Sequence, residues 1–304
     1  MQGLPLYFAL RSQHKEVFLA NLSFSELSKA DGEVILKETN PGESLVCMSI
    51  TRNTALNDRT SNSYFPEKYL CEWFKESCNE EIEIFAFKRR GSEKIAQAYS
   101  ILIQKFGIEA IVLVDGGSDS LMAGDESELG TPMEDMLSIF AVKSLNMPSF
   151  LVCLGIGADR FHGVSDCASL RAIAELTKAG GFLGSLGLEQ NMPEVKGFLE
   201  ASEFIENKMQ PSIVGFFVKS AIRGKFGNYN VLERTAGQRL FVYPLMGWYF
   251  FFDLDKVVKR IKYRQHCEGT KNATEFMVAL DAYRVEIEPE GVRPVEELPL
   301  TRET

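Results

Sequence analysis

The chain has 304 residues, of which 45% are hydrophobic and 25% charged, an ordinary globular composition with enough apolar material for a core. Its formal net charge of −9 excludes a general binder of nucleic-acid backbones, which needs a concentrated positive surface. The longest apolar stretch, residues 240–252, is too short to cross a bilayer, and we interpret it as a buried strand and turn. The first residues lack a secretory-signal pattern, and the six cysteines form no CxxC pair. We therefore expect a cytosolic protein with free thiols that binds neither nucleic acid nor membrane.

Along the first 180 residues, apolar runs alternate with segments of helical period. Strands are predicted at 16–24, 45–50, 81–88, 109–115 and 149–155. Helices are predicted at 4–12, 66–77, 92–106, 132–145 and 169–180. This alternation predicts an α/β fold with a mostly parallel, Rossmann-like sheet covered by helices on both faces. We expect the strands at 81–88, 109–115 and 149–155 to be parallel, with their carboxyl ends at one edge.

The pattern becomes helix-rich from about residue 190. Helices are predicted within 193–209 and 211–227 and near 254–262 and 273–284, with a strand-like segment at 239–245. No repeat, low-complexity tract or clear linker interrupts the chain. We therefore expect a single domain over residues 1–285 with a helix-rich C-terminal layer, followed by an extended tail at 286–304.

The first candidate site is the loop VDGGSDSLMAGDESELGTPMEDM, residues 114–136, at the end of a predicted buried strand. Such a long connection in a compact domain tends to be functional or disordered, and ligands bind at the carboxyl ends of strands in open α/β sheets. Hard carboxylate oxygens suit Mg²⁺ or another divalent cation. The candidate metal ligands are Asp115, Asp119, Asp125 and Glu126, and the glycines placed to contact a ligand are Gly116 and Gly117.

The helix after this loop offers an alternative reading of the acidic residues. Thr131 is placed to cap the helix, with Glu134 at the capping-box position. In this reading, Asp135 interacts favourably with the positive end of the helix dipole, and Glu126 and Glu128 are solvated. Both readings remain open from the sequence.

The second candidate site is LGIGADRFHGVSD, residues 154–166, after the next predicted strand. Gly155 and Gly157 permit a turn close to a ligand, and Arg160 supplies a cation. Asp159 and His162 supply a carboxylate and a side chain that titrates near neutrality. In the alternative reading, Arg160 pairs with nearby carboxylates and His162 satisfies a loop carbonyl.

The two loops follow strands that are consecutive in sequence. If these strands are neighbours in the sheet, the candidate catalytic residues Asp115, Asp159 and His162 converge, with Asp119 and Arg160 beside them. No GxSxG, HExxH or GxxxxGK[ST] motif is present, so serine-hydrolase, zincin and P-loop readings lack their motif.

The block VDGGSD…GDE…LGTPMEDMLSI resembles the central motif of a family of proteins of unknown function, DUF1152. The resemblance extends to GLPLYFALR, ANLSF and PSIVGFFVKSAIRGKFG, and thus over most of the chain. It implies no activity. It does imply an upstream strand and glycine-rich loop that this sequence lacks. We expect a chain extended by these elements to be more stable and to bind its ligand more tightly.

These observations favour an enzyme that acts on a small polar metabolite, phosphorylated or amino-bearing, at the carboxyl edge of a parallel sheet. The acidic loop would hold a divalent metal or a substrate cation, and Asp159, Arg160 and His162 would bind an anion or move a proton. The alternative is a non-catalytic ligand sensor or interaction protein, including a truncated inactive form. An enzyme needs an acid or base within hydrogen-bond reach of the substrate, whereas a sensor needs only a closed pocket.

Overall fold

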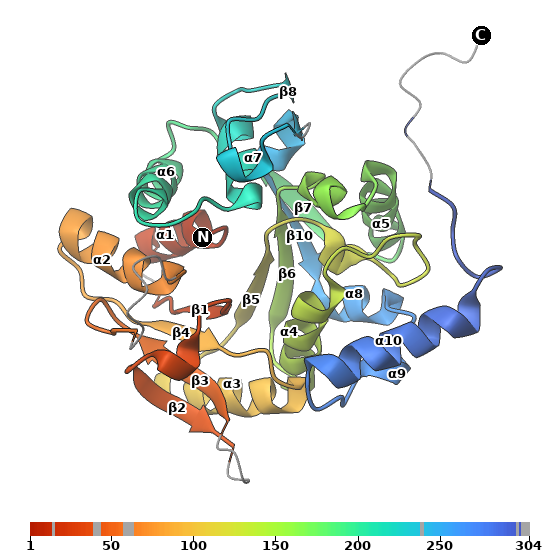
Figure 1. The fold of residues 1–304 in the computed structure, drawn as a ribbon, viewed down its shortest axis with the longest axis horizontal. Coiled ribbons are helices and arrows are strands. Elements are labelled where there is room, and N and C mark those ends of the chain that lie inside the picture. Colours follow the sequence, from red (N-terminus) through yellow and green to blue (C-terminus); the bar gives the residue numbers. More distant parts are fainter. Residues whose placement is uncertain (14–15, 39–43, 57–63, 238–239, 296–297, 299–304) are drawn as a thin grey trace.

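Two four-stranded sheets form the centre of the computed structural model, which describes residues 1–13, 16–38, 44–56, 64–237, 240–295 and 298 (Figure 1). The first has the order β1-β4-β3-β2 and the second the order β5-β6-β10-β7. The strands of the first sheet are β1 Leu19–Leu22, β2 Glu33–Lys37, β3 Leu45–Ile50 and β4 Ile84–Phe87. Those of the second are β5 Ile111–Asp115, β6 Ser149–Leu154, β7 Phe182–Gly187 and β10 Trp248–Asp253.

Helices cover both faces of these sheets. The helices are α1 Leu4–Ser12, α2 Pro66–Cys78, α3 Ser92–Phe106, α4 Pro132–Ser144, α5 Asp166–Lys178, α6 Pro193–Glu206, α7 Ile213–Ile222, α8 Leu254–Arg260, α9 Arg264–Cys267 and α10 Ala273–Ile287. A small pair of strands is formed by β8 Gly227–Asn228 and β9 Phe241–Val242. Short 3₁₀ helices, labelled η, are η1 Leu27–Lys29, η2 Asp119–Leu121, η3 Ala158–His162, η4 Glu233–Thr235 and η5 Pro244–Gly247. The α/β class predicted from the sequence is confirmed.

Alternate side chains of each strand pack against two different layers of helices, one on each face of the sheets. Cys153 of β6 and Phe85 of β4 face the cluster that contains α3, α4, α8 and α10. Their neighbours Val152 and Ile84 face the cluster that contains α1, α2 and α6. Because successive side chains of a strand point to opposite faces, both sheets lie between the same two helical layers.

The sheets are mixed, which corrects the prediction of a mostly parallel, Rossmann-like sheet. β5 and β6 are parallel, as are β1 and β4. However, β10 lies between β6 and β7 and is antiparallel to both. The strand predicted at 81–88 became β4, which belongs to the other sheet and is antiparallel to β3. Of the three strands expected to be parallel, the structure therefore pairs only the second and third.

The C-terminal third matches its predicted helices but adds a strand. α6, α7, α8 and α10 fall within or close to the predicted segments. The apolar stretch at 240–252 contains β9 and most of β10, so a buried strand is confirmed there. Part of the strand-like segment 239–245 lies outside the described residues. α10 continues to Ile287, slightly beyond the predicted domain end at residue 285.

Candidate functional site

Asp115 is the last residue of β5, and the parallel register pairs it with Cys153 of β6. The loops after β5 and β6 therefore leave the same edge of the sheet, which is the geometry that the converging-site prediction required. The carboxylate of Asp115 accepts a hydrogen bond from the Ser120 hydroxyl at 2.6 Å. Ser120 stands in η2, so this bond ties the start of the acidic loop to its strand.

Asp119 lies in η2 and is almost fully buried. Its Oδ2 accepts two hydrogen bonds from Thr131, from the backbone N–H at 2.7 Å and from the hydroxyl at 2.8 Å. A Cβ at Gly130 would lie 2.4 Å from this oxygen, so glycine is what permits the close approach. Thr131 is the N-cap residue of α4, as predicted, but its side chain caps no helix amide and Glu134 pairs with Arg89, so the predicted capping box does not form.

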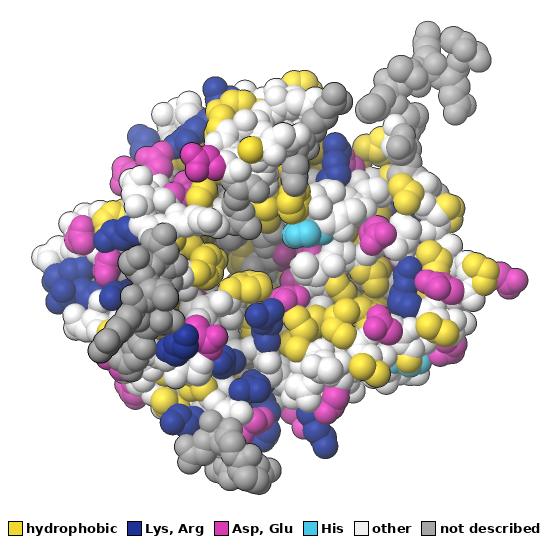
Figure 2. Space-filling view, in the orientation of Figure 1, with side chains coloured by type: hydrophobic (Ala, Val, Ile, Leu, Met, Phe, Trp, Pro, Cys, Tyr) yellow, Lys and Arg dark blue, Asp and Glu magenta, His cyan; other side chains and the backbone are white. Residues whose placement is uncertain are grey.

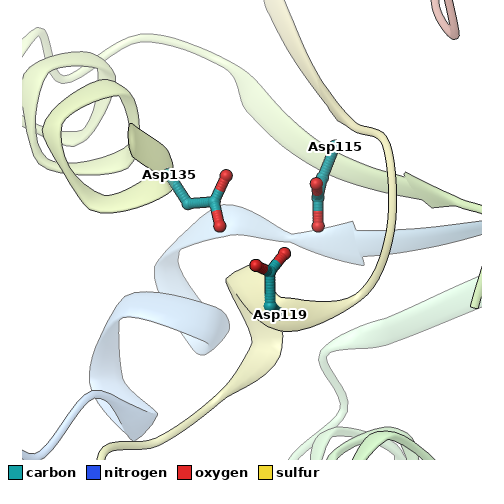
Figure 3. A group of neighbouring side chains, drawn as sticks. All are labelled: Asp115, Asp119 and Asp135. Atoms are coloured by element: carbon teal, nitrogen blue, oxygen red, sulfur yellow. The ribbon is translucent and has the colours of Figure 1, made fainter. Parts of the chain in front are cut away.

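Asp135, in the first turn of α4, completes a group with Asp115 and Asp119. One carboxylate oxygen from each of the three residues lies within 4.8 Å of the others, and Figure 3 shows the side chains pointing toward one another. The Oδ2 atom of Asp135 is buried and has no hydrogen-bond partner among the described residues. The sequence analysis assigned Asp135 only to the helix dipole and so missed it as a site residue.

Asp159, in η3, is hydrogen-bonded to the backbone of the loop that follows β5. Its Oδ2 accepts hydrogen bonds from the backbone N–H groups of Ser118 at 2.5 Å and Asp119 at 3.2 Å. A Cβ at Gly117 would lie 2.4 Å from the Asp159 carboxylate, and Gly117 has φ +153°. The predicted convergence of Asp115, Asp119 and Asp159 is therefore present.

The charges of these four aspartates are uncompensated by basic side chains in the part of the chain that the structure describes. Burial, followed by the charge of Asp119, raises the pKa of Asp115 and of Asp135 well above the usual range. The same two causes raise the pKa of Asp159 to about 7. A site that holds several enclosed carboxylates together must take up protons or a cation. We call Asp115, Asp119, Asp135 and Asp159 the carboxylate cluster.

Asp125 and Glu126, also predicted as metal ligands, lie in a different environment of the same loop. Asp125 contacts Lys262 at 2.5 Å and Arg293 at 2.9 Å. Glu126 contacts Arg293 at 2.5 Å and accepts backbone N–H bonds from residues 123 and 124. Their charges are thus compensated within the protein, and we leave them out of the proposed metal site.

The remaining predicted residues lie on the loop after β6. Gly155 and Gly157 adopt φ +102° and +89°, as expected for a turn that needs glycine. Arg160 pairs with Asp166, which is the alternative reading of its role, and its guanidinium lies over the Phe241 ring at 5.8 Å. His162 is exposed, with its ring edge against Phe161. The contacts of the described residues place neither Arg160 nor His162 against the carboxylate cluster.

Figure 2 shows this face of the molecule hollowed near its centre, between the N-terminal segment and the loops that follow β5 and β6. Gly116 packs against the N-terminal segment and α7, because a Cβ there would lie 3.2 Å from the Gln2 side chain and 3.4 Å from Val214. A separate, open hollow of about 390 Å³ is lined by residues of the loop around η4 and contains no member of the carboxylate cluster.

Together, the fold and the site define an α/β protein with a cluster of enclosed carboxylates at the carboxyl end of a parallel strand pair. The chain belongs to the family described as Protein of unknown function (DUF1152), whose model matches residues 57–290. All four members of the carboxylate cluster lie within that range. No curated protein and no solved structure matched the chain. Among the described residues, no helix is long and apolar enough to cross a membrane.

Proposed function

We propose that Asp115, Asp119 and Asp135 bind a divalent cation of the Mg²⁺ or Mn²⁺ type and, through it, a small polar metabolite. The observation that carries this proposal is the grouping of three carboxylates within 4.8 Å, one of which, Asp135, has a buried oxygen with no hydrogen-bond partner among the described residues. A bound cation would compensate the charge that the described basic residues leave uncompensated.

The donor set fits such a cation. Mg²⁺ and Ca²⁺ prefer oxygen ligands at about 2.0–2.6 Å, so two oxygens on one ion are separated by at most about 4–5 Å. The limit of 4.8 Å among the three carboxylates fits Ca²⁺ as it stands, and fits Mg²⁺ or Mn²⁺ after a small inward movement of the side chains. Mg²⁺ is usually held by a few carboxylates and completes its octahedron with water or substrate oxygens. Three aspartates would leave coordination positions for a metabolite that carries phosphate, carboxylate or hydroxyl groups.

Asp159 favours a catalytic use of this site over simple sensing. Its carboxylate is buried beside the proposed metal ligands, and a carboxylate in such a position can accept or give a proton. The hydrogen bonds from the amides of Ser118 and Asp119 hold it beside the proposed metal ligands. We therefore propose a metal-assisted enzyme with Asp159 as its acid or base. The non-catalytic sensor remains the alternative, and turnover of a bound metabolite distinguishes the two.

The test is a thermal-shift titration with Mg²⁺, Mn²⁺ and Ca²⁺. A cation at a hundred times its dissociation constant stabilises the folded state by about 2.7 kcal/mol, which raises the melting temperature by about 4 °C. Asp115→Asn combined with Asp119→Asn should abolish this gain and still fold. Glu128→Gln, on an exposed side chain of the same loop, is the matched control and should respond as the parent does. If the double variant responds like the parent, the carboxylate cluster is not the cation site.

A further inference from the structure

Two of the three proposed cation ligands are oriented by hydrogen-bond donors. Ser120 donates to Asp115, and Thr131 donates twice to Asp119. Carboxylates that ligate a metal are usually fixed in this way by a second group. Asp135 differs, because its Oδ2 is buried and has no such donor.

Tyr263 has a buried hydrogen-bond donor that lacks an acceptor. Its side chain is fully buried, yet its hydroxyl group has no hydrogen-bond partner among the described residues. A buried hydroxyl group normally has an acceptor, because leaving it unpaired costs free energy. A donor without an acceptor and an acceptor without a donor are therefore present in the same core cluster, which contains Tyr263 and the helix of Asp135.

The surroundings of Tyr263 place it beside the acidic loop. It follows α8, and both α8 and α10 pack against α4, the helix that carries Asp135. A Cβ at Gly124 would lie 2.3 Å from a ring carbon of Tyr263, so the loop lies directly on this ring. Burial raises the pKa of Tyr263 well above its usual value, and the charges of Cys267 and Asp135 raise it further. The hydroxyl group thus lies within the electrostatic field of the carboxylate cluster.

We infer that Tyr263 is a positioning residue of the cation site: its hydroxyl donates a hydrogen bond, directly or through one ordered water, to the free oxygen of Asp135 when the cation is bound. This inference rests on the function proposed above. Tyr263 would do for Asp135 what Ser120 and Thr131 do for the other two ligands. It would also explain why a tyrosine, with its polar hydroxyl group, occupies a fully buried position.

The neighbouring Tyr283 provides a matched control. Its ring lies 5.9 Å from that of Tyr263 and contacts the same loop at Gly124, but its hydroxyl is not among the buried groups that lack a partner. Removing the hydroxyl of either tyrosine leaves the ring packing in place. Because the Tyr263 hydroxyl has no hydrogen-bond partner among the described residues, Tyr263→Phe breaks none of their hydrogen bonds and should fold normally.

The experiment is a Mn²⁺ titration of the full chain, of Tyr263→Phe and of Tyr283→Phe, with free Mn²⁺ followed by electron paramagnetic resonance. Tyr263→Phe should weaken Mn²⁺ binding about 10- to 100-fold with no loss of melting temperature in the absence of metal, and Tyr283→Phe should bind as the parent does. Mg²⁺ should also perturb the tyrosine ultraviolet absorption in the parent and in Tyr283→Phe, but not in Tyr263→Phe. Equal Mn²⁺ affinity in parent and Tyr263→Phe would overturn the inference.

The outcomes separate this inference from the proposed function. If the parent binds no Mn²⁺, or if Asp115→Asn with Asp119→Asn leaves binding intact, the proposed function itself fails. If the parent binds Mn²⁺, Asp115→Asn with Asp119→Asn does not, and Tyr263→Phe binds as the parent does, the cation site stands and the role of Tyr263 is wrong. In an Asp135→Asn background, removal of the Tyr263 hydroxyl should have no further effect on Mn²⁺ affinity. An unchanged loss in that background would contradict the link between the two residues.

Discussion

The loop between β5 and α4 contains two acidic regions that differ in how their charge is compensated. In the first, Asp115 and Asp119 meet Asp135 and Asp159 with no ion pair to a described basic side chain. In the second, Asp125 and Glu126 are paired with Lys262, Arg260 and Arg293. Asp119 and Asp159 of the first region are as buried as Asp125 and Glu126, and Asp115 and Asp135 are half-buried, so solvent exposure alone does not separate the two regions. What separates them is that Arg260, Lys262 and Arg293, from the C-terminal part of the chain, pair with the second region and form no ion pair with the first among the described residues.

The pKa values express this difference. Burial raises the pKa of Asp115, and the other carboxylates of the cluster raise it further. Burial also acts to raise the pKa of Asp125, but Lys262 and Arg293 together outweigh it and lower the pKa. Asp125 is therefore stabilised as an anion by the protein itself, whereas Asp115 needs a proton or a cation. An acidic loop alone thus does not indicate a metal site, and the absence of basic partners is the informative feature.

The largest expected effect comes from removing a basic partner in the second region. Arg293→Met leaves Asp125 and Glu126 with less positive charge around them in a buried position, and should lower the free energy of unfolding by about 3 kcal/mol. Urea unfolding measures this. Arg264→Met is the control, because its pair with Glu268 is more exposed and should contribute about 0.5 kcal/mol or less. Equal losses in the two variants would show that the second region does not depend on charge compensation.

In the presence of a chelator, the pH dependence of the free energy of unfolding should report the raised pKa values of the first region. The pKa of Asp159 rises from 3.8 to about 7 on folding, so the folded state holds this proton more tightly than the unfolded state. Its contribution to stability is full below pH 3.8 and is lost as the pH rises through about 7, and the part lost between about pH 5 and 8 is about 2.5 kcal/mol. Asp125 behaves in the opposite sense, because its lowered pKa contributes stability that is lost on acidification below about pH 4.

Urea unfolding between about pH 5 and 8 in the presence of a chelator measures this loss. Saturating Mg²⁺ should reduce it, since the cation replaces the proton, and Asp159→Asn should reduce it as well. A loss of the same size in Asp159→Asn as in the parent would assign the pH dependence to other groups.

The smallest expected effect concerns the orientation of Asp119. Thr131→Val removes the hydroxyl donor at 2.8 Å but keeps the size of the side chain and the backbone N–H bond. Loss of one hydrogen bond of about 1 kcal/mol should weaken Mn²⁺ binding roughly 5-fold. Isothermal titration calorimetry measures this change. Thr270→Val, whose hydroxyl bonds only a carbonyl near α9, should leave Mn²⁺ affinity unchanged.

Local patterns in the sequence predicted the elements of the fold better than their arrangement. Helix 92–106 has apolar residues at helical spacing, and α3 confirms its bounds. β7, at 182–187, was missed because its two glycines interrupt the apolar pattern. The antiparallel insertion of β10 between β6 and β7 depends on pairing between segments distant in sequence. No local pattern indicates which partner a strand will take.

The members of the candidate site that follow strand ends were predicted, whereas those that depend on contacts between distant segments were not. Asp115 and Asp119 follow a strand end, and the parallel β5–β6 pair brings Asp159 to them as expected. Asp135 stands next to Glu134 in the sequence, and composition does not say which of the two turns inward. The ion pairs of Asp125 and Glu126 reach more than 130 residues along the chain, to Lys262 and Arg293. Only the folded structure shows these ion pairs, which are our reason to leave Asp125 and Glu126 out of the proposed cation site.

The most direct test of this account is a crystal structure grown with Mn²⁺ and measured near the manganese absorption edge. The account predicts an anomalous peak at about 2.2 Å from carboxylate oxygens of Asp115, Asp119 and Asp135, with the ion pairs of Asp125 and Glu126 intact. A peak on Asp125 and Glu126, or the absence of a peak at the carboxylate cluster when Mn²⁺ is saturating, would contradict it.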